Sequence, residues 1–384
     1  MLQRFNGNRL KTARLYREMT VEDLANELNV TKQTISLYEN DKVSFPFEKL
    51  LKLSSALKFP SEYFLQEDDP SIKSRSIYFR SLLKTKKKER ISQKIKMEHL
   101  AKIYNVMSEY LDFPALNLPE PKEYSSPEEA AMELRSFWKL GDEPIKDLVF
   151  LLEKNGILFT QFETTSDDID AFSDQIEVNG KEIILVARSS NKESAARLNF
   201  DLAHELGHIM LHEWSEDQEN IPREEFRKKE DEANAFASAF LLPRNSFISS
   251  VSSHAADLEF YAVLKKFWFV SIAAMIHRSK DLGLINLNQY QYMIRKMQIK
   301  KWWKNEPLDN ILKASSPSLL REGVKLLLEN NYLTRDELFQ SLLDAKIPME
   351  AQELETLMCL ENGTLTSVEN EKNAMIVQLK CKKN

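Results

Sequence analysis

Three closely spaced residues in this sequence are suited to metal chemistry. His204, Glu205 and His208 form an HExxH pattern within an apolar segment, residues 199–212. Residues four apart on a helix lie one turn apart on one face, so both imidazoles can point at one zinc ion. Glu205 lies about 100° further round the helix and can reach a water at the metal rather than the metal. A hydrolytic zinc enzyme needs this arrangement.

His212 is a poor candidate for the third ligand. It lies eight residues after His204, about 12 Å along a straight helix, and zinc–nitrogen bonds measure roughly 2 Å. The longer pattern HExxHxxGxxH, which breaks the helix to recruit a third histidine, is absent, because Leu211 and Trp214 stand at its glycine and histidine positions. We expect His212 to support the ligands or to end the helix.

The next helical pattern, from residue 230 to Pro243, offers a carboxylate instead. Glu232 falls on one apolar stripe with Phe236, Ala239 and Phe240. A buried carboxylate is costly unless it is paired or binds a metal, so Glu232 is our candidate, with a buried ion pair as the alternative. The rivals Glu230 and Asp231 are expected to be solvated. Two histidines, one glutamate and a water form a known catalytic zinc set.

Helices beside a small sheet must hold this site. The residues around HExxH are apolar, which predicts a buried helix. Residues 156–161 and 182–187 are rich in β-branched and aromatic side chains and predict a two- or three-stranded sheet. An edge strand there could hold a substrate backbone by strand addition, but the sequence does not identify the exposed strand.

Residues 126–283 closely resemble the ImmA/IrrE family of metallopeptidases. The matching stretches include NFDLAHELGHIMLHE, EDEANAFASAFLLP and VSIAAMIHRSKDLGLI. The resemblance implies a zincin-like α+β domain, a Zn²⁺ cofactor, and Glu232 of the Glu-Ala-Asn motif as third ligand. It also implies a protein substrate, often a DNA-bound repressor whose cleavage relieves repression. We expect Arg278, in the last stretch, to pack behind the site rather than to bind metal.

The first 68 residues form a run of short amphipathic helices. VEDLANEL is followed by the turn Asn29-Val30-Thr31 and by KQTISLYEN, with Thr20 and Thr31 as helix caps. Two short helices of this kind suit the DNA major groove. The candidate DNA contacts are the polar and basic residues of the second helix, namely Lys32, Gln33, Thr34 and Ser36. The alternative is a helical bundle whose polar residues meet only water.

Residues 7–66 resemble the lambda-repressor-like (XRE) helix-turn-helix family. The matching stretches are LANELNVTKQTISLYENDK and LLKLSSALKFPSEYFL. The resemblance implies a five-helix DNA-binding domain that places residues 20–40 in the major groove. Asp41 stands where the family usually has glycine, so we expect a slightly strained turn there. Such proteins commonly dimerise to span two half-sites, so a homodimer is expected.

Charge limits how DNA can be bound. The formal net charge is -6, which excludes binding by bulk charge. The first fifty residues hold eight basic and seven acidic side chains, whereas residues 71–110 hold eleven basic and three acidic ones. Phosphate contacts must therefore come from this basic segment or from dimerisation. The alternative for the segment is a solvated helix face.

Composition divides the chain into four regions of a mainly α, multidomain protein. We expect the helix-turn-helix domain at 1–68, a basic helical linker at 69–125, the α+β metallopeptidase domain at 126–283, and a helical region of unknown role at 284–384. Two cysteines without a CxxC pair exclude a zinc finger and a disulfide framework. No apolar stretch approaches the roughly 20 residues that cross a bilayer, and the start is too polar for a signal peptide. We expect a cytoplasmic protein with no membrane partner.

The predicted function is that of a DNA-binding zinc endopeptidase. It would cleave a repressor-type protein to control transcription in a phage, mobile-element or stress-response switch. The alternative is a helix-turn-helix regulator whose zinc site is structural or acts as a sensor. Glu205 favours the peptidase, because a purely structural site does not need it.

Overall fold

A computed structural model describes the chain in seven segments, residues 4–69, 72–79, 86–162, 171–189, 194–214, 221–303 and 305–366. Contacts divide the chain into two compact units. Unit 1 combines residues 1–70, 87–112 and 320–384, and unit 2 combines residues 71–86 and 113–319. The predicted linker at 69–125 and C-terminal region at 284–384 are therefore each shared between the two units.

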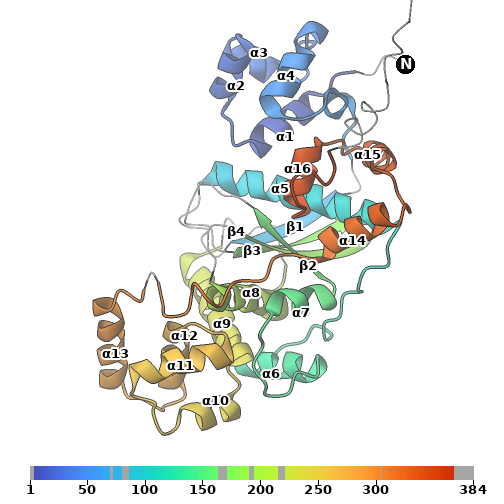
Figure 1. The fold of residues 1–384 in the computed structure, drawn as a ribbon. Helices are drawn as coiled ribbons and strands as arrows, with labels where there is room; N and C mark the ends of the chain where they lie inside the picture. The colour runs from blue at the N-terminus through green and yellow to red at the C-terminus, as the bar shows by residue number, and fades with distance from the viewer. Residues whose placement is uncertain are drawn as a thin grey trace, which may run out of the picture. The chain divides into compact units, whose positions relative to one another are not determined.

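The N-terminal part of unit 1 is helical, as predicted (Figure 1). Its elements are α1 (Gly7–Tyr16), α2 (Val21–Leu28), α3 (Lys32–Glu39) and α4 (Leu50–Leu57), with 3₁₀-helices at Phe47–Lys49 and Ser61–Leu65. Thr20 and Asp23 form a capping box at α2, and Thr31 caps α3. Leu24 and Ile35 are wholly buried in the core. Four α-helices and two 3₁₀-helices thus stand where five helices were expected.

The turn after α3 adopts the conformation that the family glycine would favour. Asp41 has a φ of 52°, in the left-handed region that asparagine and aspartate tolerate better than most residues. Its carboxylate accepts a hydrogen bond of 3.0 Å from the Gly7 amide. Gly7 is itself required, because a Cβ there would lie 2.1 Å from the Tyr38 carbonyl oxygen. This hydrogen bond offsets the strain predicted at Asp41.

Four further helices complete unit 1, namely α5 (Lys87–Met107), α14 (Leu319–Glu329), α15 (Arg335–Asp344) and α16 (Ala351–Leu357). Ser92 of α5 donates a hydrogen bond of 2.7 Å to the Tyr16 carbonyl. Glu353 of α16 accepts a hydrogen bond from the Tyr16 hydroxyl and forms a 2.6 Å ion pair with Arg17. Part of the C-terminal region therefore packs against the first helix of the helix-turn-helix.

Unit 2 contains a four-stranded sheet in the order β1-β3-β4-β2. The strands are β1 (Ile72–Phe79), β2 (Ile157–Phe162), β3 (Ala171–Val178) and β4 (Lys181–Ser189). β3 and β4 form an antiparallel hairpin through Asn179-Gly180, both with positive φ. β2 runs parallel to β4, and β1 runs antiparallel to β3. β1 corrects the prediction of a wholly helical linker, since basic residues are also tolerated in edge strands.

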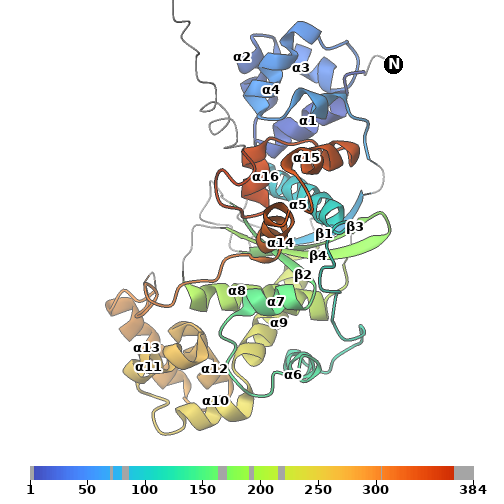
Figure 2. The ribbon, with the colours of Figure 1, turned by 45° about the vertical axis from the view of Figure 1, so that its right-hand side comes forward.

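The helices of unit 2 are numbered α6 to α13. They are α6 (Pro127–Phe137), α7 (Leu148–Lys154), α8 (Ala195–Leu211), α9 (Arg223–Leu241), α10 (Arg244–Val251), α11 (Leu258–Trp268), α12 (Ile272–Asp281) and α13 (Leu287–Ile299). Figures 1 and 2 show α7, α8 and α9 on one face of the sheet. Val186 of β4 and Phe159 of β2 share a buried core with Leu202 of α8. The sheet thereby fixes the position of α8.

Among the described residues, no single helix has the length and apolarity needed to cross a bilayer. Helices α11 and α12 meet these criteria only when taken together, and they are bent by 106° at the break between them.

Candidate metal centre

Helix α8 brings the two histidines of the HExxH pattern together. The Nε2 atoms of His204 and His208 lie 3.0 Å apart, and both side chains are buried. Apolar neighbours such as Leu202 and Leu206 hold the helix against the core. The one-turn spacing of the two imidazoles agrees with the helical geometry expected from the sequence.

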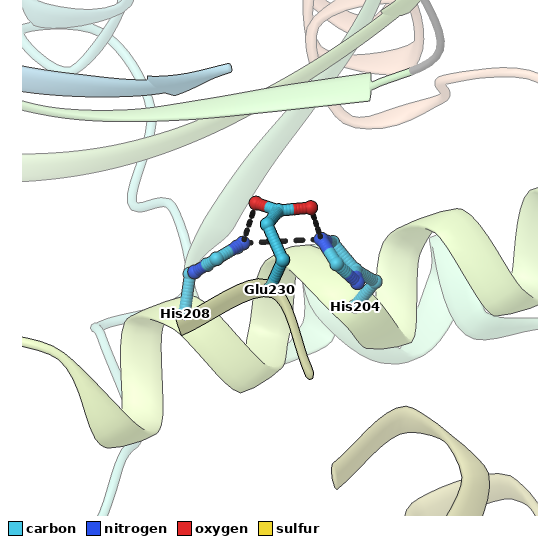
Figure 3. A group of neighbouring side chains, drawn as sticks. All are labelled: His204, His208 and Glu230. Atoms are coloured by element: carbon cyan, nitrogen blue, oxygen red, sulfur yellow. Dashed lines mark hydrogen bonds and ion pairs between the residues drawn. The ribbon is translucent and has the colours of Figure 1, made fainter. Parts of the chain in front are cut away.

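Glu230 of α9 completes a cluster of three metal-ligand types (Figure 3). Its carboxylate oxygens lie 3.5 Å from His204 Nε2 and 3.2 Å from His208 Nε2. A tetrahedral zinc ion with bonds of roughly 2.0–2.1 Å would separate its ligand atoms by about 3.3 Å. The observed separations of 3.0, 3.2 and 3.5 Å lie on both sides of that value. The three side chains therefore fit a single zinc ion.

This cluster corrects the predicted placement of Glu232. The Glu232 side chain is 35% exposed and contacts His212 and Lys228, whereas Glu230 is 16% exposed and faces the imidazoles. The reason is the rotation of α9, because residues 230 and 232 lie about 200° apart around a helix.

The packing of α9 against α8 fixes this rotation. Gly207 packs directly against Ala233, where an added Cβ would lie 3.1 Å from the Ala233 Cα. Around the helix Glu230 lies about 60° from Ala233, and Asn234 lies about 40° beyond Glu230, so these three residues span about 100° of the helix surface on the side of α8. The small pair Gly207 and Ala233 was the signal in the sequence that could have identified this face.

Neighbouring polar groups orient each imidazole. The Asn234 amide oxygen lies 3.0 Å from His204 Nδ1, so this nitrogen donates and Nε2 keeps its lone pair for a metal. His208 Nδ1 lies 2.9 Å from His212 Nδ1, and His212 Nε2 lies 3.1 Å from a Glu232 oxygen. His212 thus lies where a supporting residue was expected. Asn234 was missed, although it belongs to the Glu-Ala-Asn motif.

Glu205 lies between α8 and the sheet. Its side chain is wholly buried, and one carboxylate oxygen accepts a hydrogen bond of 2.6 Å from the Ser173 hydroxyl of β3. This bond stabilises the charged carboxylate and fixes its direction. The sequence did not reveal Ser173, because its contact with Glu205 depends on how β3 crosses α8.

The pKa values of two carboxylate–histidine groups follow from these contacts. Burial raises the pKa of Glu230, but the hydrogen bonds and charges of His204 and His208 outweigh it and lower the pKa to about 2. Burial and the neighbouring His208 lower the pKa of His212 to about 4, against the influence of Glu232. At neutral pH Glu230 is therefore a carboxylate and His212 is uncharged.

The Arg278 side chain forms hydrogen bonds with a residue of α6 and with the residue that follows α9. Its guanidinium donates to the Glu128 carboxylate at 2.9 Å and to the Leu242 carbonyl at 3.2 Å. These bonds tie α12 to α6 and to the end of α9. The structure therefore shows Arg278 in a packing role.

The predicted DNA contacts lie along α3. Lys32, Gln33 and Ser36 are exposed, and Lys32 forms a 2.8 Å ion pair with Glu22. Thr34 is half-buried, and its hydroxyl lies 2.9 Å from that of Thr31, within the helix cap. Three of the four predicted side chains are therefore presented to solvent, and the fourth is engaged in capping.

Comparison with protein families finds a match for the N-terminal helices and a second match for the region that holds the cluster. Residues 152–280 match the peptidase family M78 model, described as the IrrE N-terminal-like domain, and residues 10–64 match a helix-turn-helix family model. A comparison with curated proteins found no match for this chain. The two matches confirm the predicted fusion of an XRE-type helix-turn-helix with an ImmA/IrrE-like domain. All the residues of the metal cluster lie within the peptidase match.

Proposed function

We propose that this chain is a DNA-binding zinc endopeptidase. The observation that carries the proposal is the convergence of His204, His208 and Glu230 beside the buried carboxylate of Glu205, inside a region matched to a metallopeptidase family. A structural site has no use for a buried, hydrogen-bonded carboxylate next to its ligands, whereas a hydrolase needs a general base there.

The residues of the cluster have distinct roles in this proposal. His204, His208 and Glu230 would hold the zinc ion, which when bound polarises the scissile carbonyl and acidifies a water. Glu205 accepts a proton from the attacking water and delivers it to the nitrogen of the leaving amine. Ser173 holds the Glu205 carboxylate in position through its hydroxyl.

We further propose a repressor-type protein as the substrate. Lys32, Gln33 and Ser36 on the exposed face of α3 would contact DNA in the major groove. Binding there would place the peptidase near DNA-bound repressors, and a homodimer would span two half-sites. Because its partners are DNA and DNA-bound proteins, we place its action in the cytoplasm.

Incubation of the zinc-loaded protein with the repressor encoded nearest its gene tests this proposal. We expect the repressor to be cleaved by the wild-type chain and to stay intact with Glu205→Gln, which should retain zinc because Glu205 is not a ligand. An intact repressor with the wild-type chain, or equal cleavage by both proteins, would contradict the peptidase. If Glu205→Gln leaves transcriptional control unchanged, the site serves as a sensor or a structural element.

A further inference from the structure

The strand nearest the proposed catalytic base has its outer edge covered by a segment of the same chain. Ser173 of β3 contacts Glu205, which makes β3 the strand over the site. On one side β3 pairs with β4, and on the other side it pairs with β1. The β1 pairing runs from Ile72 opposite Val178 to Phe79 opposite Phe172. β1 therefore covers nearly the whole length of the outer edge of β3.

The metal ligands lie on the surface of α8 that faces the strands, as Figure 3 shows. Glu205, in the same helix, reaches β3 through its hydrogen bond with Ser173. Because β4 already pairs with one edge of β3, a further strand could add to β3 only at the edge on which β1 pairs.

An extended peptide commonly binds by adding a strand to a sheet edge. We propose that the outer edge of β3 is the surface that binds the substrate backbone and that β1 occupies this position until it is displaced. This inference rests on the proposed peptidase function. A peptide that added to the outer edge of β1 instead would lie one strand spacing, about 4.8 Å, further from Glu205.

The path of the chain connects β1 to the helix-turn-helix unit at both ends. Residues 1–70 and 87–112 belong to unit 1, whereas residues 71–86 belong to unit 2. β1 is thus the part of the N-terminal chain that leaves the helix-turn-helix unit to join the peptidase sheet.

The pairing of β1 lies at an edge of the sheet. Within the described strands, β3 and β4 each have two neighbours, whereas β1 and β2 each have one. The register of β1 shifts between Ser74 and Ile77, so the ladder is interrupted at an irregularity. A substrate strand that replaces β1 would recover the same backbone hydrogen bonds to β3. Exchange of strands therefore requires little net loss of pairing.

A binding experiment tests the inference without relying on catalysis. In the full-length Glu205→Gln chain, residues 72–79 are replaced by eight glycines and serines. A labelled peptide of sequence IKSRSIYF should bind this variant at least about tenfold more tightly than the chain with β1 intact. Binding should slow amide hydrogen exchange in residues 172–178, and a scrambled peptide should not. Equal binding to both chains, or no binding to the replaced chain, would overturn the inference.

A reversible disulfide bond between β1 and β3 provides the second test. Lys73 and Glu177 are directly opposite in the register, and opposed Cα atoms about 4.5–5.5 Å apart are within disulfide range. Lys73→Cys with Glu177→Cys, in a chain with Cys359→Ser and Cys381→Ser, should cleave substrate only after reduction. Cleavage at the same rate in the oxidised form would show that β1 does not have to leave. Peptide binding to the replaced chain without any cleavage by active variants would support the β3 surface and refute the proposed protease.

Discussion

The amide oxygen of Asn234 lies 3.0 Å from Nδ1 of His204. Asn234 follows Glu230 by four residues on α9, so one face of this helix supplies both the carboxylate of the cluster and the group that orients an imidazole on α8. The site therefore depends on the contact between the two helices as much as on the HExxH pattern.

Loss of the Asn234 oxygen should weaken zinc binding. We expect Asn234→Ala to lower zinc affinity by roughly 10- to 100-fold, as is usual when the partner of a ligating histidine is removed. Chelator competition measures this effect. Asn234→Asp keeps an acceptor at the same place and should retain most of the affinity. Equal losses in the two variants would show that the amide oxygen does not set the orientation of His204.

Glu230 and Glu232 should differ sharply when each is changed. Glu230→Gln removes the carboxylate that faces both imidazoles, so zinc content should fall well below one ion per chain. Glu232→Gln changes a side chain that contacts His212 and Lys228, so most of the zinc should remain. Metal analysis after dialysis compares the two proteins. The reverse result would restore Glu232 as the third ligand.

The sequence predicted the parts of the site that depend on local geometry. His204, Glu205 and His208 belong to one helical segment, so their relative positions follow from helix spacing alone. The choice between Glu230 and Glu232 depends on the rotation of α9 against α8, which the packing of Gly207 on Ala233 determines. A stripe of apolar residues identified a buried side of α9 but not the part that faces the metal site.

The other differences between the predicted and the observed structure involve contacts between residues that are far apart in the sequence. β1 pairs with a strand about a hundred residues later in the chain, and its basic residues resembled those of the neighbouring helix α5. Ser173 has no motif of its own, and only the crossing of β3 over α8 brings it to Glu205. The helix caps at Thr20 and Thr31, by contrast, are local features and are present as expected.

Gly207 should be intolerant of even a methyl group. In Gly207→Ala the new Cβ would lie 3.1 Å from the Ala233 backbone and 3.2 Å from Phe236 Cβ, so α9 must move. Overpacking of this kind typically costs about 1–3 kcal/mol. Urea unfolding of the metal-free protein should show that loss, and chelator competition should show weaker zinc binding. If both the free energy of unfolding and the zinc affinity stay unchanged, the close contact between α8 and α9 does not restrict the side chain at position 207.

In the proposed DNA binding by α3, Gln33 and Thr34 should have different roles. Gln33 is exposed, so Gln33→Ala should cost about 1–3 kcal/mol of binding and relax sequence preference. Thr34 is engaged with Thr31, so Thr34→Val should mainly lower stability and leave sequence preference unchanged. The DNA used is a duplex selected by the wild-type chain from a random pool. A larger change in sequence preference for Thr34→Val than for Gln33→Ala would contradict this assignment.

Unit 2 should lose part of its stability in acid through Asp309. Burial raises the pKa of Asp309, but hydrogen bonds from Lys265 and Ser194 and the Lys265 charge outweigh burial and lower the pKa below its ordinary value. Because the folded pKa is below the unfolded value of about 3.9, the carboxylate stabilises the fold above that pH. This contribution is lost as the pH falls through the folded value.

Urea unfolding in the presence of a chelator, from pH 7 down to pH 2, tests this assignment. Asp309→Asn should be less stable than the wild-type chain at pH 7, and the two should converge as the pH falls, because the wild-type carboxylate becomes protonated. Asp281→Asn is the matched control, since the Asp281 side chain is 54% exposed beside Lys280 and should change little at any pH. If the Asp309→Asn and wild-type curves stay parallel, another group is responsible for the acid sensitivity of unit 2.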